Sequence, residues 1–383
     1  MDLHQKRFNK FILFLTIAIF PWHYAISQEE QLSISELPHI LYSPNDTTIM
    51  WIEGNERLAV SSKDSVAYQV AIMELSSKFG IPLAEALSFN FNTHKFKTRL
   101  NSIDKFTAVS DIHGQYNLFV ELLKANNVID RENNWSYGNG VLLINGDIFD
   151  RGNKVSESLW LVFKLYVQAR EHGGEVIYQS GNHELMVFDK DLRYISDKYK
   201  VASELFEKSY DELYISPNSI FGKWLKELPI MTLINDILFT HAGVSEELVN
   251  RKLSIETINQ LFIDSIYTRE KEEYRKSEQL NFLARTNGPL WYRGYFKDES
   301  LNTAEVKNWV NQYQANHLVV GHTSQKEIRT LFNNTIIAID SSIKGGKHGE
   351  ILVYENGKLY ASDRAGNRRL LFETIKPSFE YPR

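Results

Sequence analysis

Asp, His and Asn residues recur at five places in the sequence where an apolar run ends. The first is Asp111-Ile-His113. In an extended segment, residues two apart point the same way, so this carboxylate and this imidazole converge on one point. Such a pair can bind a metal ion, although a single pair of this kind is more often an ordinary surface or capping arrangement.

The second place is Gly146-Asp147-Ile-Phe-Asp150-Arg151-Gly152, which brings two carboxylates and a guanidinium into one turn. The glycines at its two ends allow a tight backbone and close approach to a ligand. Asp147 could bridge two metal ions, and Arg151 could hold phosphate oxygens bidentately. A plain ion pair between Asp150 and Arg151 is the structural alternative.

The third place is Gly181-Asn182-His183-Glu184. Asparagine is an unusual metal ligand. If Asn182 gives its side-chain oxygen to a metal, His183 lies beside the site and is free to donate a proton to a leaving group. Asp150 would then orient this acid, as the third member of a catalytic triad does.

The fourth and fifth places are His241 and His322, each next to an alanine or a glycine after an apolar run. Either histidine alone could be structural, but five such places together favour one shared site. The chain has no cysteine, so any metal is held by nitrogen and oxygen, a set that suits Mn, Fe or Zn. Two such ions would clamp a phosphate and lower the pKa of a bridging water, giving a hydroxide for in-line attack.

Short β-branched runs alternate with helix-like segments from residue 104 onward, which indicates stacked β-α units. Most of the candidate residues follow the strands of this pattern, where open α/β sheets place their ligands. Residues 189–228 and 246–290 lack strand signals and are predicted to be helical insertions. The expected strands are 106–109, 141–144, 176–178, 237–239, 317–320, 336–339 and a hairpin over 351–360.

The N-terminal 27 residues have the pattern of a secretory signal peptide. Lys6, Arg7 and Lys10 precede the apolar run 11–20, and small residues follow at 25–27. The run is shorter than the roughly 20 residues that span a bilayer, so we expect export to the periplasm or the medium without a stable membrane anchor. The net charge of −5 provides no basic surface for nucleic acid, and no nucleic-acid partner is expected.

Taken in order, these five motifs resemble those of the calcineurin-like metallophosphoesterases. The Asp-Arg-Gly and Asn-His-Glu forms resemble phosphoprotein phosphatases of the bacterial Shewanella-like type, over about residues 104–365. The resemblance implies an α/β fold in four layers, α/β/β/α, with a central two-sheet β-sandwich flanked by helices. Residues 28–103 would be an N-terminal extension packed on this core, and 366–383 a C-terminal tail.

The resemblance also implies two metal ions and their ligands. Asp111, His113 and Asp147 would hold one ion, while Asp147, Asn182, His241 and His322 would hold the other. His183 would be the acid with Asp150 as its partner. Arg293, in Gly288-Pro-Leu-Trp-Tyr-Arg293-Gly294, resembles a second phosphate-binding arginine.

These observations predict a hydrolase that removes phosphate from phosphomonoesters, either phosphoproteins or small molecules. A phosphodiesterase or a dinucleoside polyphosphate hydrolase could use the same core, and two arginines favour a terminal phosphate only modestly. A secreted binding protein with a dead site is the alternative from another class. Such a site would be expected to lack a ligand or the acid, and this sequence has both.

Overall fold

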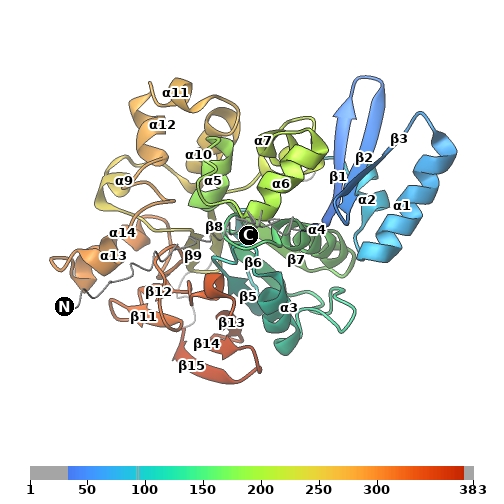
Figure 1. Cartoon of the computed structure of the whole chain (residues 1–383). Coiled ribbons are helices and arrows are strands. Elements are labelled where there is room, and N and C mark those ends of the chain that lie inside the picture. The colour runs from blue at the N-terminus through green and yellow to red at the C-terminus, as the bar shows by residue number, and fades with distance from the viewer. Residues whose placement is uncertain (1–32, 92, 94, 375–383) are drawn as a thin grey trace, which may run out of the picture. The chain divides into compact units, whose positions relative to one another are not determined.

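Two six-stranded sheets form the centre of the computed structural model, which describes residues 33–374 apart from 92 and 94 (Figure 1). In the first sheet the order is β15-β14-β13-β5-β6-β7, with β5, β6 and β7 parallel. Its strands are β5 (Lys105–Val109), β6 (Val141–Asn145), β7 (Glu175–Gln179), β13 (Glu350–Glu355), β14 (Lys358–Asp363) and β15 (Arg368–Glu373).

The second sheet has the order β11-β12-β10-β9-β8-β4, and β9, β10 and β12 are parallel. Its strands are β4 (Arg99–Leu100), β8 (Met231–Ile234), β9 (Ile237–Thr240), β10 (His317–Val320), β11 (Arg329–Leu331) and β12 (Ile336–Ala338). The parallel strands of both sheets are short apolar runs, as expected for strands that are covered on both faces.

Apolar side chains from the two sheets meet in a shared core. Phe106 of β5 and Phe239 of β9 are both fully buried, and their ring centroids lie 5.5 Å apart, edge to face. Val141, Ile177 and Val319 belong to the same cluster. This core packs the two sheets against each other, and so it also fixes the positions of the loops that follow their strands.

Helices cover the outer faces of the sandwich, which confirms the predicted architecture of two sheets flanked by helices. On the first sheet these are α3 (Tyr116–Ala125) and α4 (Val155–Glu171), and α4 runs beside β7 (Figure 1). The helices after β9 are α9 (Glu246–Asn250), α10 (Ile255–Leu261), the π-helix η1 (Phe262–Ile266), α11 (Lys271–Tyr274), α12 (Glu278–Leu283), α13 (Gly294–Lys297) and α14 (Thr303–Asn311), with a short 3-10 turn η2 (Ile343–Gly345) after β12.

The N-terminal extension forms a small sheet of its own. Its elements are β1 (Glu36–Ser43), β2 (Asp46–Glu53), β3 (Glu56–Ser61), α1 (Ser65–Phe79) and α2 (Leu83–Ser88). Asp64 caps α1, and Gly80 ends it with a φ of 66°. Ile40 and Ile49 are fully buried in the same apolar cluster as Trp160 of α4, so the extension packs on the helices that cover the first sheet.

Both predicted insertions are helical in the structure. After α5 (Asn182–Phe188), the first contains α6 (Asp197–Phe206), α7 (Tyr210–Tyr214) and α8 (Ile220–Leu225). The prediction of a C-terminal tail from residue 366 is wrong for Arg368–Glu373, because β15 pairs with β14 and extends the first sheet. The alternation of apolar residues in this strand is weak, and its burial is only partial.

The predicted signal peptide lies outside the described residues. Among residues 33–374, leaving aside 92 and 94, no helix combines the length and the apolar character that crossing a membrane requires.

Candidate active site

Five segments, each after the C-terminal end of a strand, bring the predicted site residues together. Three of these segments follow the parallel strands β5, β6 and β7 of the first sheet, the third being the start of α5, and two follow β9 and β10 of the second. The residues that they carry are Asp111, His113, Asp147, Asp150, Arg151, Asn182, His183, His241 and His322. All of them are buried except Arg151, whose side chain reaches the surface.

The loops after β5, β6 and β10 hold several of these residues in the left-handed region of backbone space. The φ angles are 55° for Asp111, 48° for His113, 61° for Asp147, 72° for Asp150, 66° for Arg151 and 64° for His322. A side chain at positive φ is costly and persists only where surrounding contacts over-determine the backbone. Their concentration around one point marks the site independently of its residue types.

Two glycines let these loops approach closely. A Cβ on Gly181 would lie 2.2 Å from Oδ1 of Asp147, and a Cβ on Gly321 would lie 2.5 Å from Oδ2 of Asp111. Neither position accepts a larger residue without moving a carboxylate. These two glycines therefore leave the space that the carboxylates of Asp147 and Asp111 occupy.

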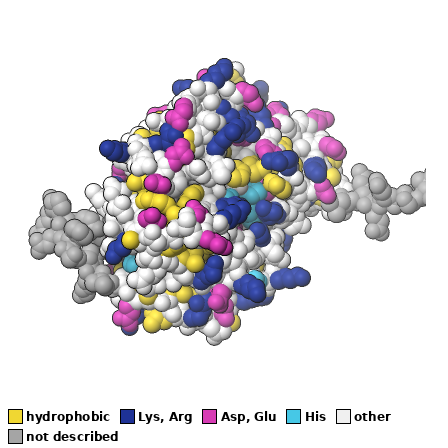
Figure 2. Space-filling model, turned by 90° about the vertical axis from the view of Figure 1, so that its left-hand side faces the viewer, with side chains coloured by type: hydrophobic (Ala, Val, Ile, Leu, Met, Phe, Trp, Pro, Cys, Tyr) yellow, Lys and Arg dark blue, Asp and Glu magenta, His cyan; other side chains and the backbone are white. Residues whose placement is uncertain are grey.

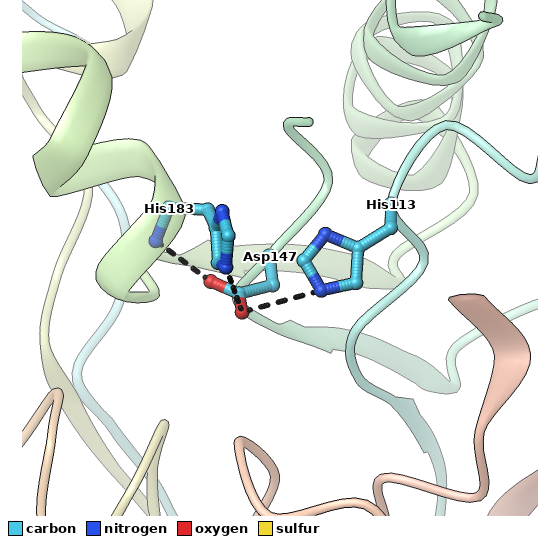
Figure 3. Close-up of side chains that lie close together, drawn as sticks. All are labelled: His113, Asp147 and His183. Carbon is cyan, nitrogen blue, oxygen red and sulfur yellow. Dashed lines mark hydrogen bonds and ion pairs between the residues drawn. The ribbon is translucent and has the colours of Figure 1, made fainter. Parts of the chain in front are cut away.

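Asp147 lies at the centre of the site, between His113 and His183 (Figure 3). Its Oδ2 is 3.6 Å from Nε2 of His113 and 4.0 Å from Nε2 of His183. The ring of His113 is fixed because its Nδ1 donates a hydrogen bond of 2.7 Å to the carbonyl of Phe149. Nε2 of His113 therefore faces Asp147, and Asp111 adds a carboxylate oxygen 4.0 Å away.

A second group surrounds the same carboxylate from the other sheet. Nε2 of His241 lies 3.3 Å from Oδ2 of Asp147 and 3.0 Å from Oδ1 of Asn182. Its Nδ1 is held by the carbonyl of Asn145 at 2.8 Å. His322 completes this group, and its Nε2 is buried without a hydrogen-bond partner.

The buried ionisable groups of the site shift one another's pKa values. Burial opposes ionisation of Asp147, but the charges of His241 and His183 hold the pKa of this carboxyl well below its ordinary value. Burial also disfavours the charge on His241, yet the carboxylate of Asp147 raises the pKa of His241 to about 10. By contrast, burial lowers the pKa of His113 to about 3. A cation among these groups would satisfy carboxylates and neutral imidazoles together.

These residues fit bound metal. The candidate ligand atoms of His113, Asp147 and His183 lie within 4.8 Å of one another, and so do those of Asp147, His241 and His322. Each ring whose Nδ1 bonds a backbone carbonyl presents Nε2 inward, as metal-binding histidines do. The unpartnered Nε2 of His322 gains a partner only if an ion or another ligand occupies this space.

His183 differs from the other histidines in its partners. Its Nδ1 lies 2.5 Å from Oδ2 of Asp150, and its backbone N–H donates to Oδ1 of Asp147 at 3.0 Å. Nε2 of His183 is left facing the guanidinium of Arg151, 3.5 Å away. The ring is thus oriented by one carboxylate and presents its other nitrogen beside a positively charged group.

Arg293 lies at the second group of site residues. Its Nη1 donates to the carbonyl of His322 and to Oγ1 of Thr323, each at 3.1 Å. The two predicted phosphate-binding arginines, Arg151 and Arg293, therefore flank the cluster. In Figure 2, histidine side chains reach the surface with Lys or Arg side chains beside them and hydrophobic side chains close by.

Two residues of the site were not assigned a role from the sequence. The buried carboxylate of Glu184 accepts hydrogen bonds from the backbone N–H groups of Asp147, Ile148 and Gly181. The ring of Tyr194 is 43% exposed; it lies 5.3 Å from the guanidinium of Arg151 and 5.5 Å from the ring of His183. In the sequence, Glu184 directly follows Asn182 and His183, and this position could have marked it as a site residue. No sequence feature of the helical insertion distinguished Tyr194.

Comparison with known proteins agrees with this geometry. The sequence pattern of the family described as calcineurin-like phosphoesterase matches residues 104–326. Shewanella-like protein phosphatase 1 of Plasmodium berghei is 32% identical over 249 residues, which cover 62% of this chain and 67% of that protein. Shewanella-like protein phosphatase 2 of Arabidopsis thaliana is 31% identical over 102 residues, covering 27% of this chain and 26% of that protein.

Solved structures extend the similarity over most of the chain. A cold-active protein tyrosine phosphatase superimposes with a TM-score of 0.79 at 35% identity, covering 89% of this chain and 98% of that one. A crystal structure of the cold-active protein-tyrosine phosphatase of a psychrophile, Shewanella sp., gives a TM-score of 0.77 at 35% identity, covering 88% and 100%. The similarity reaches into the N-terminal extension, because 89% of the chain is more than residues 104–383 make up.

Proposed function

Since this chain belongs to the calcineurin-like phosphoesterase family and is a phosphoric ester hydrolase, we propose that it releases phosphate from phosphomonoesters with His183 as the leaving-group acid. The observation that carries the proposal is the arrangement of His183, whose Nδ1 is bound by Asp150 while Nε2 faces Arg151. Nε2, the nitrogen that would donate the proton, lies beside the guanidinium that would bind the phosphate.

The proposed metal ligands are Asp111, His113, Asp147, Asn182, His241 and His322. When bound, two ions of Mn, Fe or Zn supply positive charge that activates water and neutralises phosphate. Arg151 and Arg293 bind the remaining phosphate oxygens, and a dianionic monoester uses two guanidinium groups better than a diester does. Asp150 orients His183, which gives a proton to the leaving oxygen as the ester bond breaks.

Phosphotyrosine is the substrate class that we propose for this site. The exposed ring of Tyr194 lies beside His183, and the ring of Trp291 lies 5.9 Å from the ring of His322, so aromatic surfaces border the site next to both groups. An aryl leaving group can pack against such rings, while a serine side chain cannot. The similar solved structures are named as tyrosine phosphatases, which supports the same choice.

A test of the reaction compares p-nitrophenyl phosphate with bis-p-nitrophenyl phosphate, using protein stripped of metal and then supplied with Mn, Zn, Fe or Mg. We expect metal-dependent turnover of the monoester and its loss in Asp147→Asn. Asp298→Asn, at an exposed aspartate, is the matched control and should keep full activity. Preference for the diester would identify a phosphodiesterase, and the absence of turnover with every metal would contradict the assignment.

Export is a second proposal, supported only by the sequence of the first 27 residues. Basic residues before an apolar run and small residues at 25–27 are typical of a cleaved signal. N-terminal sequencing of the protein after expression in a Gram-negative host tests this directly. A mature chain that begins near residue 28 in the periplasmic or extracellular fraction is expected, whereas a full-length chain in the cytoplasm would contradict export.

A further inference from the structure

Glu36 is the first residue of β1 in the N-terminal extension, and its carboxylate is buried. This carboxylate contacts side chains on three other elements. Its Oε1 accepts hydrogen bonds from Oγ of Ser156, on α4, and from the hydroxyl of Tyr214, on α7, the latter at 3.2 Å. Its Oε2 pairs with Nζ of Lys198, on α6, at 2.6 Å. Glu36 thus joins the extension to two helices of the first insertion and to the first turn of α4.

These partners hold both ends of the loop that carries Asp150 and Arg151. At its C-terminal end, the hydroxyl of Tyr199, the neighbour of Lys198, accepts a hydrogen bond of 2.6 Å from the backbone N–H of Val155. Ser156, the next residue, is the one bound by Glu36. The start of α4 is therefore tied to α6 by two adjacent contacts.

At the N-terminal end of the same loop, the ring of Tyr214 packs edge to face against Phe149, with centroids 5.6 Å apart. The carbonyl of Phe149 is the acceptor that fixes the ring of His113. The tyrosine that donates to Glu36 thus also supports the residue directly before Asp150.

The middle of the loop is tied to the segment that leads into α6. The backbone N–H of Arg151 donates to the carbonyl of Tyr194 at 2.8 Å, and the ring of Tyr194 lies beside the guanidinium. Lys198 follows four residues later and ends on Glu36. Asp150 and Arg151 have φ angles of 72° and 66°, a conformation that needs such external support.

We infer that Glu36 is a positioning residue, which holds the loop from Phe149 to Ser156 so that Arg151 points at the phosphate. The inference rests on the proposed function of Arg151 as a phosphate ligand. A buried ion pair contributes little net stability compared with apolar packing, so stability alone is a weak reason for a charged network at this place. It also gives the N-terminal extension a role in catalysis, although its described residues supply none of the metal-ligand or proton-donor candidates.

The test measures KM and kcat separately for Glu36→Gln with p-nitrophenyl phosphate and the preferred metal. Loss of the carboxylate should raise KM, and the inhibition constant of inorganic phosphate, by about fivefold, with kcat changed by less than about twofold. In an Arg151→Ala background, the same substitution should leave KM nearly unchanged, because the residue that Glu36 positions is already absent. A KM increase of equal size in both backgrounds would overturn the inference.

Ile49→Val provides the matched control for stability. Ile49 is fully buried in β2 of the extension and pairs across the sheet with Ile40 and Val60, so its truncation weakens the extension without removing the carboxylate of Glu36. We expect a lower denaturation midpoint and an unchanged KM. A KM increase in Ile49→Val equal to that in Glu36→Gln would show that the effect follows stability rather than positioning.

Hydrogen–deuterium exchange provides a readout that does not depend on turnover. In Glu36→Gln, amides of residues 149–156 and 194–199 should exchange faster, while amides of the second sheet keep their wild-type rates. Unchanged exchange over 149–156 would overturn the inference even if the enzyme showed no activity on p-nitrophenyl phosphate. Failure of the phosphatase proposal and failure of the positioning role are therefore distinguished.

Discussion

Nδ1 of His183 lies 2.5 Å from Oδ2 of Asp150, while the backbone N–H of the same histidine donates to Asp147. One residue is thereby fixed to both functional parts of the site, the metal-ligand group through its main chain and the orienting carboxylate through its ring. This double attachment holds the imidazole in a fixed position, as protonation of a leaving-group oxygen would require.

His183→Asn should reveal a leaving-group acid by its dependence on the substrate. We expect kcat to fall by about 10²- to 10⁴-fold for an alkyl phosphate such as phosphoserine, whose alkoxide needs a proton to depart. The loss should be much smaller for p-nitrophenyl phosphate, because nitrophenolate leaves without protonation. Steady-state kinetics on the two substrates provide the measurement, with His348→Asn, at an exposed histidine, as control. Equal losses on both substrates would argue against proton donation.

Gly181→Ala should impair the metal site without removing a ligand. The new Cβ would lie 2.2 Å from Oδ1 of Asp147, so the shared carboxylate must move. We expect affinity for Mn to fall by about 10- to 100-fold, measured by calorimetric titration of the stripped protein. Gly345→Ala is the control, since a Cβ at Gly345 meets no atom within 4 Å. Wild-type affinity in Gly181→Ala would contradict the placement of Asp147.

Glu184→Gln should destabilise the whole molecule. The carboxylate accepts hydrogen bonds from three backbone N–H groups and from the hydroxyl of Tyr178, all buried. An amide presents one oxygen and turns an NH₂ group toward donors, so we expect the free energy of unfolding to drop by about 2–4 kcal/mol. Urea denaturation of the metal-free protein measures this. A drop that appears only with metal present would instead place Glu184 among the ligands.

Glu36 should make stability depend on pH in the acid range. Burial opposes its ionisation, but the hydrogen bond with His39 and the charge of Lys198 hold the pKa of Glu36 below its ordinary 4.5. The contribution of a depressed carboxyl is present above the ordinary value and is lost as the pH falls through the folded-state pKa. The stability difference between wild type and Glu36→Gln should therefore be greatest near neutral pH and shrink below pH 4.5.

Denaturation midpoints of both proteins across this range provide the measurement. Glu299→Gln, at an exposed glutamate, should match wild type at each pH. A difference between wild type and Glu36→Gln that stays constant down to the acid limit would show that Glu36 is already neutral in the folded protein.

Tyr194→Leu should change the choice of substrate. The substitution keeps an apolar side chain but removes the ring beside Arg151 and His183. We expect KM for a phosphotyrosine peptide to rise by about fivefold, and KM for a phosphoserine peptide to stay within about twofold. Parallel kinetics on two peptides of identical flanking sequence provide the test. An equal rise for both peptides would mean that Tyr194 acts only through the arginine.

The site residues that could be predicted from the sequence are those that directly follow an apolar strand pattern. Asp147 and Asn182 each follow a buried apolar run, so their convergence was predictable from the rule that parallel strands end at one edge. Arg293 was predicted only by resemblance to a family, because its loop has no period of its own. The structure nevertheless places its guanidinium on the carbonyl of His322.

The rest was not visible because it depends on contacts between distant segments. Tyr194 lies in a helical insertion whose pattern indicates only a solvated surface, and its place beside Arg151 is fixed by a backbone hydrogen bond. In the sequence, Glu36 is a polar residue of an ordinary strand. Only the fold places Lys198 and Tyr214 against its carboxylate. Strand β15 was missed because a half-exposed edge strand lacks a clear alternation.

The bond between Glu36 and Tyr214 spans 178 residues, which has a consequence for how the chain folds. During synthesis β1 emerges before α6 and α7, so the carboxylate of Glu36 meets Lys198 and Tyr214 only after these later helices have been made. Contacts of such high sequence separation form late, since a long loop must close before they stabilise anything. We therefore expect the local pairing of β5, β6 and β7 to form before Glu36 meets Tyr214, so that the loop from Phe149 to Ser156 is fixed only after these strands are in place.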